Sequence, residues 1–163
     1  MGNKIVFDLD GVMRDLMGYC HDRFDVTSPT EWFWKHNGKD VYRLVKEDNY
    51  NALIYSPPTK YLSTIKKYSK KLEIWSHQPP KWRSYTKHWL DYYLGEYSIR
   101  YLTTKQKRAR LDKHKDTWLV EDNPNFKSYK RIILIDRLYN RNVDCYRVKT
   151  SSKLNKVLNY SRR

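Results

Sequence analysis

Six short apolar runs alternate with helical patterns along this chain, and that alternation restricts its fold more than any other property of the sequence. Runs of this kind are typical of strands that are buried on both faces of a parallel sheet. They lie at residues 4–9, 72–75, 99–102, 118–120 and 132–135, with a weaker one at 145–148. Helical spacing is expected between them, over residues 57–68, 80–93 and 153–160. Strands that alternate with helices predict an α/β fold with a parallel sheet and right-handed crossovers.

Residues 14–55 interrupt this alternation. Within them, Ser28-Pro29-Thr30-Glu31 matches a capping box with proline at the first helical position, which predicts a short helix through Trp32, Phe33 and Trp34. A second helix is expected over residues 40–48. We therefore predict a small helical insertion after the first strand of a larger core domain. The insertion is residues 14–55, and the core domain is residues 1–13 together with 56–163.

The charge of the chain is strongly positive. Its 163 residues include 33 Lys and Arg against 18 Asp and Glu, a formal charge of +15. Such an excess favours contact with phosphates, either free or in nucleic acid, although a solvated basic surface is the plainer interpretation. No apolar run approaches the roughly 20 residues that span a bilayer, so we expect no membrane contact. Two cysteines are too few for a disulfide framework, which favours a reducing, cytoplasmic location.

Acidic side chains follow the first predicted strand directly, in the sequence Asp8-Leu9-Asp10-Gly11. Side chains at positions i and i+2 of a strand point the same way, so Asp8 and Asp10 should converge where open parallel sheets bind ligands. Gly11 allows a sharp turn there. Two close carboxylates repel unless a cation relieves them, and their hard oxygens suit Mg²⁺. The plainer alternative is a polar turn that caps the next segment.

Polar residues also follow the next three strands. Ser76 and His77 end the second strand, Lys105 follows the third, and Glu121 and Asp122 end the fourth. A nucleophile, an acid/base, a hydroxyl donor, a cation and a metal carboxylate thus occur in that order, each after a strand. Each residue alone is weak evidence, but the ordered set predicts phosphoryl transfer.

This order resembles that of the haloacid dehalogenase (HAD) superfamily of phosphatases. Residues 8–12 are similar to its first motif, Ser76 to its second, Lys105 to its third, and residues 121–122 to its fourth. Within the superfamily the chain most resembles the 5'(3')-deoxyribonucleotidase-like group, including its small phage-encoded members. Three segments carry that likeness, at residues 7–12, 86–90 and 135–141. The resemblance implies a Rossmann-like, HAD-like parallel sheet with a small helical cap after the first strand.

The resemblance also implies a mechanism. Asp8 would attack phosphorus, and Asp10 would protonate the leaving alcohol before activating water. Mg²⁺ would be held by Asp8, the backbone carbonyl of Asp10, and Asp122. Ser76 and Lys105 would bind and neutralise the phosphate. The expected substrate contacts are Gly11, Ser76, His77 and Lys105.

Several positions depart from the family pattern or leave alternatives open. Glu121 stands where an aspartate is usual, so we assign the metal to Asp122 and a supporting role to Glu121. The stretch between Lys105 and Glu121 is long, which makes Lys107 a rival for the third-motif lysine. The aromatic residues of the insertion could stack on a base, but packing onto the core domain is the favoured interpretation. They are Trp32, Phe33, Trp34 and Tyr42. Solvated surface charge is the expectation for Arg14, Lys35 and Lys39.

Three functions follow from these patterns. The first is a Mg²⁺-dependent phosphomonoesterase that acts on nucleoside monophosphates, especially deoxynucleotides. The second keeps the chemistry but acts on 3'-phosphates at nucleic-acid ends, as the positive charge and the short insertion favour. The third is a nucleic-acid-binding protein on a phosphatase fold that has lost its activity. The presence of Asp8, Asp10 and Asp122 argues against the third.

Overall fold

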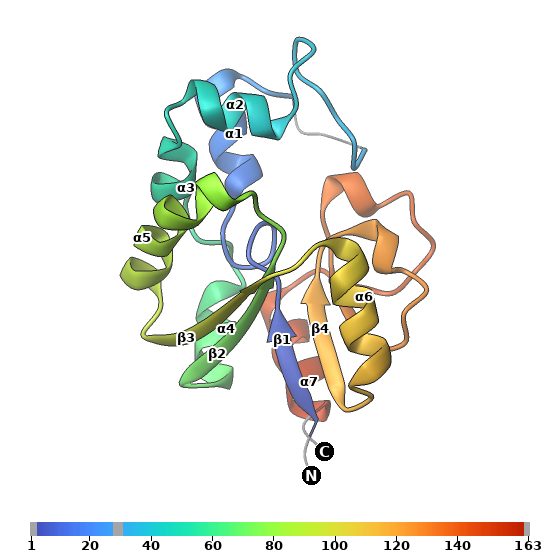
Figure 1. The fold of residues 1–163 in the computed structure, drawn as a ribbon. Helices are drawn as coiled ribbons and strands as arrows, with labels where there is room; N and C mark the ends of the chain where they lie inside the picture. Colours follow the sequence, from blue (N-terminus) through green and yellow to red (C-terminus); the bar gives the residue numbers. More distant parts are fainter. Residues whose placement is uncertain (1–2, 28–30, 162–163) are drawn as a thin grey trace.

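The computed structural model describes residues 3–27 and 31–161 of the chain. Within them, six strands form one sheet in the order β3-β2-β1-β4-β5-β6, and all neighbouring strands are parallel (Figure 1). The strands are β1 (Lys4–Phe7), β2 (Lys71–Ser76), β3 (Glu96–Tyr101), β4 (Thr117–Glu121), β5 (Ile132–Ile135) and β6 (Arg147–Val148). The predicted α/β fold with a parallel sheet is therefore confirmed, and every apolar run contributes to one of its strands.

The described residues contain seven α-helices, six of them between strands and α7 after β6. They are α1 (Leu16–Phe24), α2 (Val41–Glu47), α3 (Asn51–Tyr55), α4 (Leu62–Tyr68), α5 (Arg83–Tyr93), α6 (Thr104–Lys113) and α7 (Ser151–Tyr160). Short 3₁₀ turns occur at Pro80–Trp82, Pro124–Phe126 and Leu138–Asn140. Helices were expected at α2, α4, α5 and α7, whereas α1, α3 and α6 were not.

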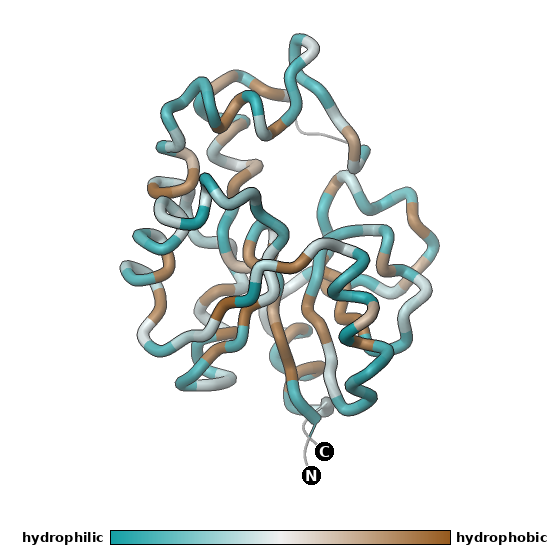
Figure 2. The backbone as a smooth tube through the Cα atoms, in the orientation of Figure 1, coloured by the Kyte–Doolittle hydropathy of each residue, from teal (hydrophilic) through white to brown (hydrophobic). Residues whose placement is uncertain are grey.

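The two faces of the sheet carry separate apolar layers, because alternate residues of a strand point to opposite faces. Ile5 and Phe7 of β1 pack in the larger layer, beneath α4, α5 and α7. Val6 packs in the smaller layer on the opposite face, together with Leu111 of α6 and Leu119 of β4. Figure 2 shows hydrophobic residues along the strands and hydrophilic ones on the outer side of α6. Asp8 and Glu121 continue the alternation of Val6 and Leu119, and so face α6.

The direction of the chain across the sheet reverses at β1. Strands β2 and β3 lie on one side of β1, whereas β4, β5 and β6 lie on the other. The crossovers that follow β1 and β4 therefore leave the sheet in opposite directions, which opens a crevice at the carboxyl ends of these two strands. In open α/β sheets, ligands bind at such a switch point. The acidic residues after β1 and β4 meet there.

The described part of the insertion, residues 14–27 and 31–55, lies over this carboxyl edge of the sheet (Figure 1). It has a small apolar cluster of its own, in which Leu16, Val45 and Leu53 pack with Trp82 from the turn before α5. The expected helix at Trp32–Trp34 is absent: this stretch is a turn followed by an extended bridge between His36 and Lys39. The predicted capping box falls partly on residues 28–30, which lie outside the described residues.

Two further features concern the helices. Helix α6 begins with a capping box in which Thr103 and Gln106 each bond the other's backbone N–H. The capping box adjoins the most basic stretch of the chain, and only Leu111 and Lys107 of the helix are buried.

No helix of the described residues has both the length and the apolar composition needed to cross a membrane.

Candidate active site

A cavity of about 520 Å³ opens at the switch point, between the carboxyl ends of β1 and β4 and the insertion. Its floor carries three buried carboxylates, from Asp8, Glu121 and Asp122. One oxygen of each lies within 4.8 Å of the others, close enough for a shared metal ion. Asp10, which was expected to converge with Asp8, also lines the cavity but lies outside this cluster.

Lys107 supplies the positive charge of the cluster. Its Nζ donates to Asp8 Oδ1 at 2.6 Å and to Glu121 Oε2 at 2.8 Å, and the side chain is buried. Burial opposes its protonation, but the charges of Asp8 and Glu121 prevail and raise the pKa of Lys107. Lys107 is therefore a permanent cation that holds Asp8 at the end of β1.

The lysine expected at this place was Lys105, and the structure corrects that expectation. Lys105 is exposed and does not line the cavity. It lies two residues before Lys107, about 200° around the helix, and so points away from the sheet. Lys107 and Leu111 are four residues apart and share the buried face of α6.

Three buried carboxylates share this one lysine, which leaves negative charge that is not neutralised. Burial and the charge of Glu121 raise the pKa of Asp8 to about 8, although Lys107 opposes the shift. Burial and the charges of Glu121 and Asp8 likewise raise the pKa of Asp122 well above its ordinary value. A divalent cation would relieve this repulsion.

The hydrogen bonds of the carboxylates distinguish their roles. Glu121 uses both oxygens internally: Oε2 accepts from Lys107, and Oε1 accepts from the backbone N–H groups of Asp122 and Asn123 at 3.2 and 3.3 Å. Asp122 Oδ2 accepts from the Tyr139 hydroxyl. Within the described residues, Asp8 Oδ2 and Asp122 Oδ1 accept no hydrogen bond. These two oxygens can bind a cation without losing an internal partner.

Position 11 must be glycine because its backbone lies too close to Asp122 for any side chain to fit. A Cβ atom on Gly11 would lie 1.8 Å from Asp122 Oδ2 and 2.8 Å from the Tyr139 hydroxyl, and the φ angle of Gly11 is +83°. The Gly11 carbonyl accepts from Arg137 Nε at 2.8 Å. The loop after β5 thus supports the loops after β1 and β4, a role that sequence reasoning did not assign to Arg137 or Tyr139.

Asp10 is held by a buried arginine. Arg14 Nε donates to Asp10 Oδ1 at 2.7 Å and Arg14 Nη2 to Asp10 Oδ2 at 3.1 Å, while Gln78 Nε2 donates to Oδ2 at 2.8 Å. Arg14 is wholly buried, so the expectation of a solvated surface charge is wrong. Its Nη1 donates to the Leu53 carbonyl in α3 and to Thr86 Oγ1 in α5. The spacing of Asp10 and Arg14, i and i+4, was the available sequence signal.

The end of β2 contributes the two residues that were expected from it. Ser76 is buried, His77 is exposed, and both line the cavity. Partial burial and the nearby charge of Lys107 lower the pKa of His77. Around neutral pH this imidazole is therefore mainly uncharged and can donate one hydrogen bond.

Aromatic side chains line the same cavity as the carboxylates. Trp32 meets Tyr139 edge to face at 5.4 Å between ring centroids, and Tyr42 packs on Trp82 at 4.9 Å. Phe33 also lines the cavity although 84% of it is exposed. The packing expected of these residues is thus found for Trp32 and Tyr42, which line the cavity at the same time.

Three buried carboxylates, a buried lysine and several aromatic rings therefore share one cavity at the reversal point of a parallel sheet. No protein-family model matches the chain, and no curated protein sequence matches it either.

Proposed function

We propose that this protein is a Mg²⁺-dependent phosphomonoesterase that acts on nucleoside monophosphates, especially deoxynucleotides, through an aspartyl-phosphate on Asp8. One observation carries the proposal: Asp8, Glu121, Asp122 and Lys107 form a buried cluster at the carboxyl ends of β1 and β4. A carboxylate beside a fixed cation and a metal site can serve as a nucleophile toward a phosphate, whose negative charge would otherwise repel it. The order of motifs that resembles HAD phosphatases supports the same chemistry.

The residues of the cluster fit Mg²⁺. Asp8 Oδ2 and Asp122 Oδ1 are carboxylate oxygens that have no donor among the residues described, and hard oxygen ligands are those that Mg²⁺ prefers. Asp8 and Asp122 would hold the ion, with the Asp10 backbone carbonyl as the expected third protein ligand. When bound, Mg²⁺ supplies charge neutralisation between the carboxylates and the phosphate.

The proposed reaction has two displacement steps at phosphorus. In the first, a carboxylate oxygen of Asp8 forms a bond to phosphorus as the bond to the leaving alcohol oxygen breaks. The Asp10 carboxyl gives its proton to that oxygen. In the second, Asp10 takes a proton from water, the water oxygen bonds to phosphorus, and the bond from phosphorus to Asp8 breaks. Inorganic phosphate leaves, and both aspartates return to their initial states.

Neighbouring side chains hold these groups in place. Lys107 fixes the orientation of Asp8 and offsets the charge that collects on the phosphate oxygens. Ser76, which lines the cavity beside Lys107, would donate to one of these oxygens. Arg14 and Gln78 together bond both oxygens of the Asp10 carboxylate, which sets the direction in which it faces the leaving group.

The aromatic walls support a nucleotide as the substrate. A cavity of about 520 Å³ has room for a mononucleotide, and both the acidic cluster and the rings of Trp32, Tyr42 and Trp82 line it. Stacking on such rings stabilises a bound base by roughly 1–3 kcal/mol. A substrate with a phosphate at one end and a flat ring at the other could contact both the acidic cluster and the aromatic rings of this cavity.

Phosphate release tests the proposal directly. The substrates are the deoxynucleoside monophosphates, each measured with Mg²⁺ and with a chelator, for the wild type and for Asp8→Asn. We expect turnover that requires Mg²⁺ and is lost in Asp8→Asn. Activity that persists in Asp8→Asn would exclude Asp8 as the nucleophile.

A second substrate class is favoured by the charge of +15. A 3'-phosphate at a nucleic-acid end would reach the same acidic floor while the strand crosses the basic surface. In that case a 3'-phosphorylated oligonucleotide would be preferred over mononucleotides. Its turnover would also fall steeply with salt, because bound counterions are released.

A further inference from the structure

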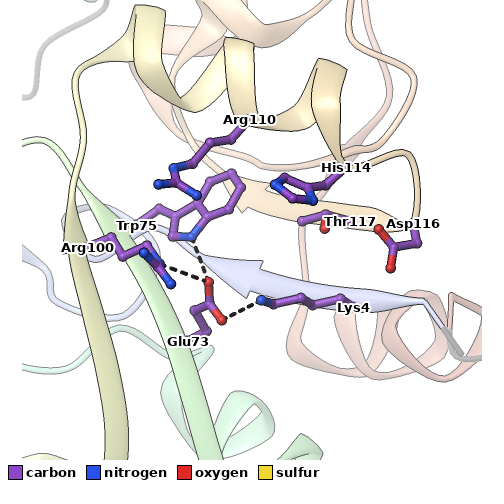
Figure 3. A pocket seen from close by; sticks show the side chains of 8 residues that line it. All are labelled: Lys4, Glu73, Trp75, Arg100, Arg110, His114, Asp116 and Thr117. Carbon is purple, nitrogen blue, oxygen red and sulfur yellow. Dashed lines mark hydrogen bonds and ion pairs between the residues drawn. The ribbon is translucent and has the colours of Figure 1, made fainter.

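A second pocket, of about 280 Å³, lies on the α6 face of the sheet and shares no lining residue with the acidic cavity. In Figure 3 the indole of Trp75 lies at its centre. Arg110 reaches the pocket from α6 and His114 from the C-cap of that helix, whereas Arg100 from β3 and Lys4 from β1 reach it from the sheet (Figure 3). Four basic side chains from three elements thus converge on one small space.

Glu73 pairs closely with one of these basic groups, Lys4, and loosely with a second, Arg100. Glu73 Oε2 accepts from Lys4 Nζ at 2.6 Å, and Glu73 Oε1 accepts from the Trp75 indole at 3.0 Å and lies 3.6 Å from Arg100 Nε. This network fixes the sheet side of the pocket. It also occupies the carboxylate of Glu73, which is therefore not available to groups on α6.

The other two basic groups have no partner. Within residues 3–27 and 31–161, neither the Arg110 guanidinium nor the His114 imidazole makes a hydrogen bond, an ion pair or a ring contact. Asp116, the second acid of the pocket, is exposed and forms no ion pair with either of them. Arg110 is half-buried, so its charge has lost part of its hydration without gaining a counter-charge. Such an arginine is complementary to an anion that enters the pocket.

We propose that this pocket binds a phosphate group. The planar fork of Arg110 can donate two parallel hydrogen bonds to phosphate oxygens, and either tautomer of His114 can donate a third. Arg100, exposed at the rim and only loosely paired with Glu73, adds positive charge from the opposite side. The group is either free phosphate or a phosphodiester of a nucleic-acid strand, since the two share this chemistry. This site is separate from the acidic cavity and does not depend on the function proposed above.

An NMR titration tests this site selectively. The readout is the imidazole signal of His114, assigned by its loss in His114→Gln. Sodium phosphate is added at constant pH with a chelator, against sodium chloride at equal ionic strength. We expect a saturable shift with phosphate only. Arg110→Gln should weaken the binding at least about tenfold, as for the loss of a charge-assisted hydrogen bond.

The matched control is Lys113→Gln, which removes the same charge from the same helix outside the pocket. It should change the phosphate affinity less than about twofold, because an exposed charge acts only through solvent. Equal weakening by Lys113→Gln and Arg110→Gln would overturn the proposal, as would identical shifts with phosphate and chloride.

A second titration distinguishes the source of the phosphate. The probe is a short single-stranded oligonucleotide with hydroxyl groups at both ends, which offers phosphodiesters alone. A His114 shift that saturates at a lower concentration than with inorganic phosphate, and that Arg110→Gln weakens, identifies a nucleic-acid backbone as the ligand. A shift with inorganic phosphate alone identifies free phosphate. If neither probe gives a saturable shift, the pocket is not a phosphate site.

Discussion

The side chain of Lys107 joins the nucleophile proposed here to the acid that ends β4, and its place on α6 decides the chemistry of the cavity. The sequence offered two lysines for this role, two residues apart in a basic stretch. Composition does not separate them, since both precede β4 in a segment rich in cations. The distinction comes from helical phase: Lys107 lies on the same face as Leu111, the buried apolar residue of α6. That pairing at i and i+4 could have been recognised once a helix was assigned there.

Replacing Lys107 by glutamine should therefore affect activity and stability together. Turnover of deoxynucleotides should fall about a hundredfold, as for the loss of one group that stabilises developing charge. The free energy of unfolding in the absence of metal should fall by about 3–5 kcal/mol, because two buried carboxylates lose their partner. Steady-state kinetics and urea unfolding measure the two effects. Lys105→Gln is the control, and a similar loss there would contradict the assignment.

Arg14 shows a different limit of sequence reasoning at the residue scale. A lone arginine after an acidic loop is most often a surface charge, and its burial depends on partners that are distant in sequence. Those partners are the Leu53 carbonyl and Thr86 Oγ1, 39 and 72 residues away. Only the contact with Asp10, four residues away, could have been predicted from a local sequence pattern.

Arg14→Lys should disturb Asp10 selectively, because a lysine cannot reproduce the two-pronged contact. Turnover should fall about a hundredfold for a substrate with an alkyl alcohol leaving group, which needs a proton donor. It should stay within about threefold for 4-nitrophenyl phosphate, whose leaving group needs none. Steady-state rates on both substrates give the comparison. Thr86→Val removes an Arg14 contact without touching Asp10, and should change neither rate by more than about threefold.

If Arg14→Lys lowers the rates on both substrates equally, Arg14 supports the fold and does not position the acid.

At the scale of elements, the strands were predictable and several helices were not. The strands β1, β4 and β5 are mostly buried on both faces because helices cover both sides of the sheet, and this burial leaves a plain signal in the sequence. Helix α6 has one apolar residue on its buried face and depends on its cap, so no apolar period is visible. At Trp32–Trp34 the opposite happened, since a helix was predicted there and none is present. A capping box at residues 28–31 predicted a helix through the three aromatic residues, but they line the cavity from a turn and the residue that follows it.

The aromatic residues with which the insertion lines the cavity lead to a separate prediction. Trp32→Ala should raise the KM for deoxynucleotides about fivefold or more, since one stacking partner contributes roughly 1–3 kcal/mol. It should leave the rate on glycerol phosphate, which has no ring, nearly unchanged. Tyr55→Ala is the matched control, because Tyr55 lies exposed in α3 of the same insertion and does not line the cavity. An equal effect of Trp32→Ala on both substrates would show that the insertion acts on the phosphate end instead.

At the scale of the whole molecule, the site depends on topology. The residues of the acidic cluster come from β1, α6 and β4, which are separated by up to 114 residues of chain. They meet because the sheet reverses its direction at β1 and because alternate residues of β1 and β4 face α6. The sequence order of polar residues after strands predicted that Asp8 and Asp122 meet at one edge of the sheet, but it favoured Lys105 over Lys107 as the cation beside them. It could not reveal how many protons a cluster of three carboxylates and one lysine would retain.

That proton balance links the site to the stability of the entire fold. In the absence of metal, burial and Glu121 raise the pKa of Asp8 from its ordinary 3.8 to about 8. Between these two values the folded protein keeps a proton that the unfolded chain releases. The contribution of Asp8 to the free energy of unfolding is therefore at its full value below about pH 4. It is lost progressively as the pH rises toward 8.

Thermal unfolding with a chelator should consequently show a melting temperature that falls by several degrees between pH 5 and pH 8. Each kcal/mol lost lowers it by about 2–4 °C in a chain of this size. Mg²⁺ should reverse the trend, because it binds the ionised carboxylates of the folded state alone, and its stabilisation should be larger at pH 8 than at pH 5. Asp8→Asn cannot titrate at this position and should weaken both dependences, while Asp122, whose pKa is also raised, retains part of the dependence on pH. Melting temperatures of the variant and the wild type that move in parallel with pH and Mg²⁺ would exclude Asp8 as the group that couples metal binding to folding.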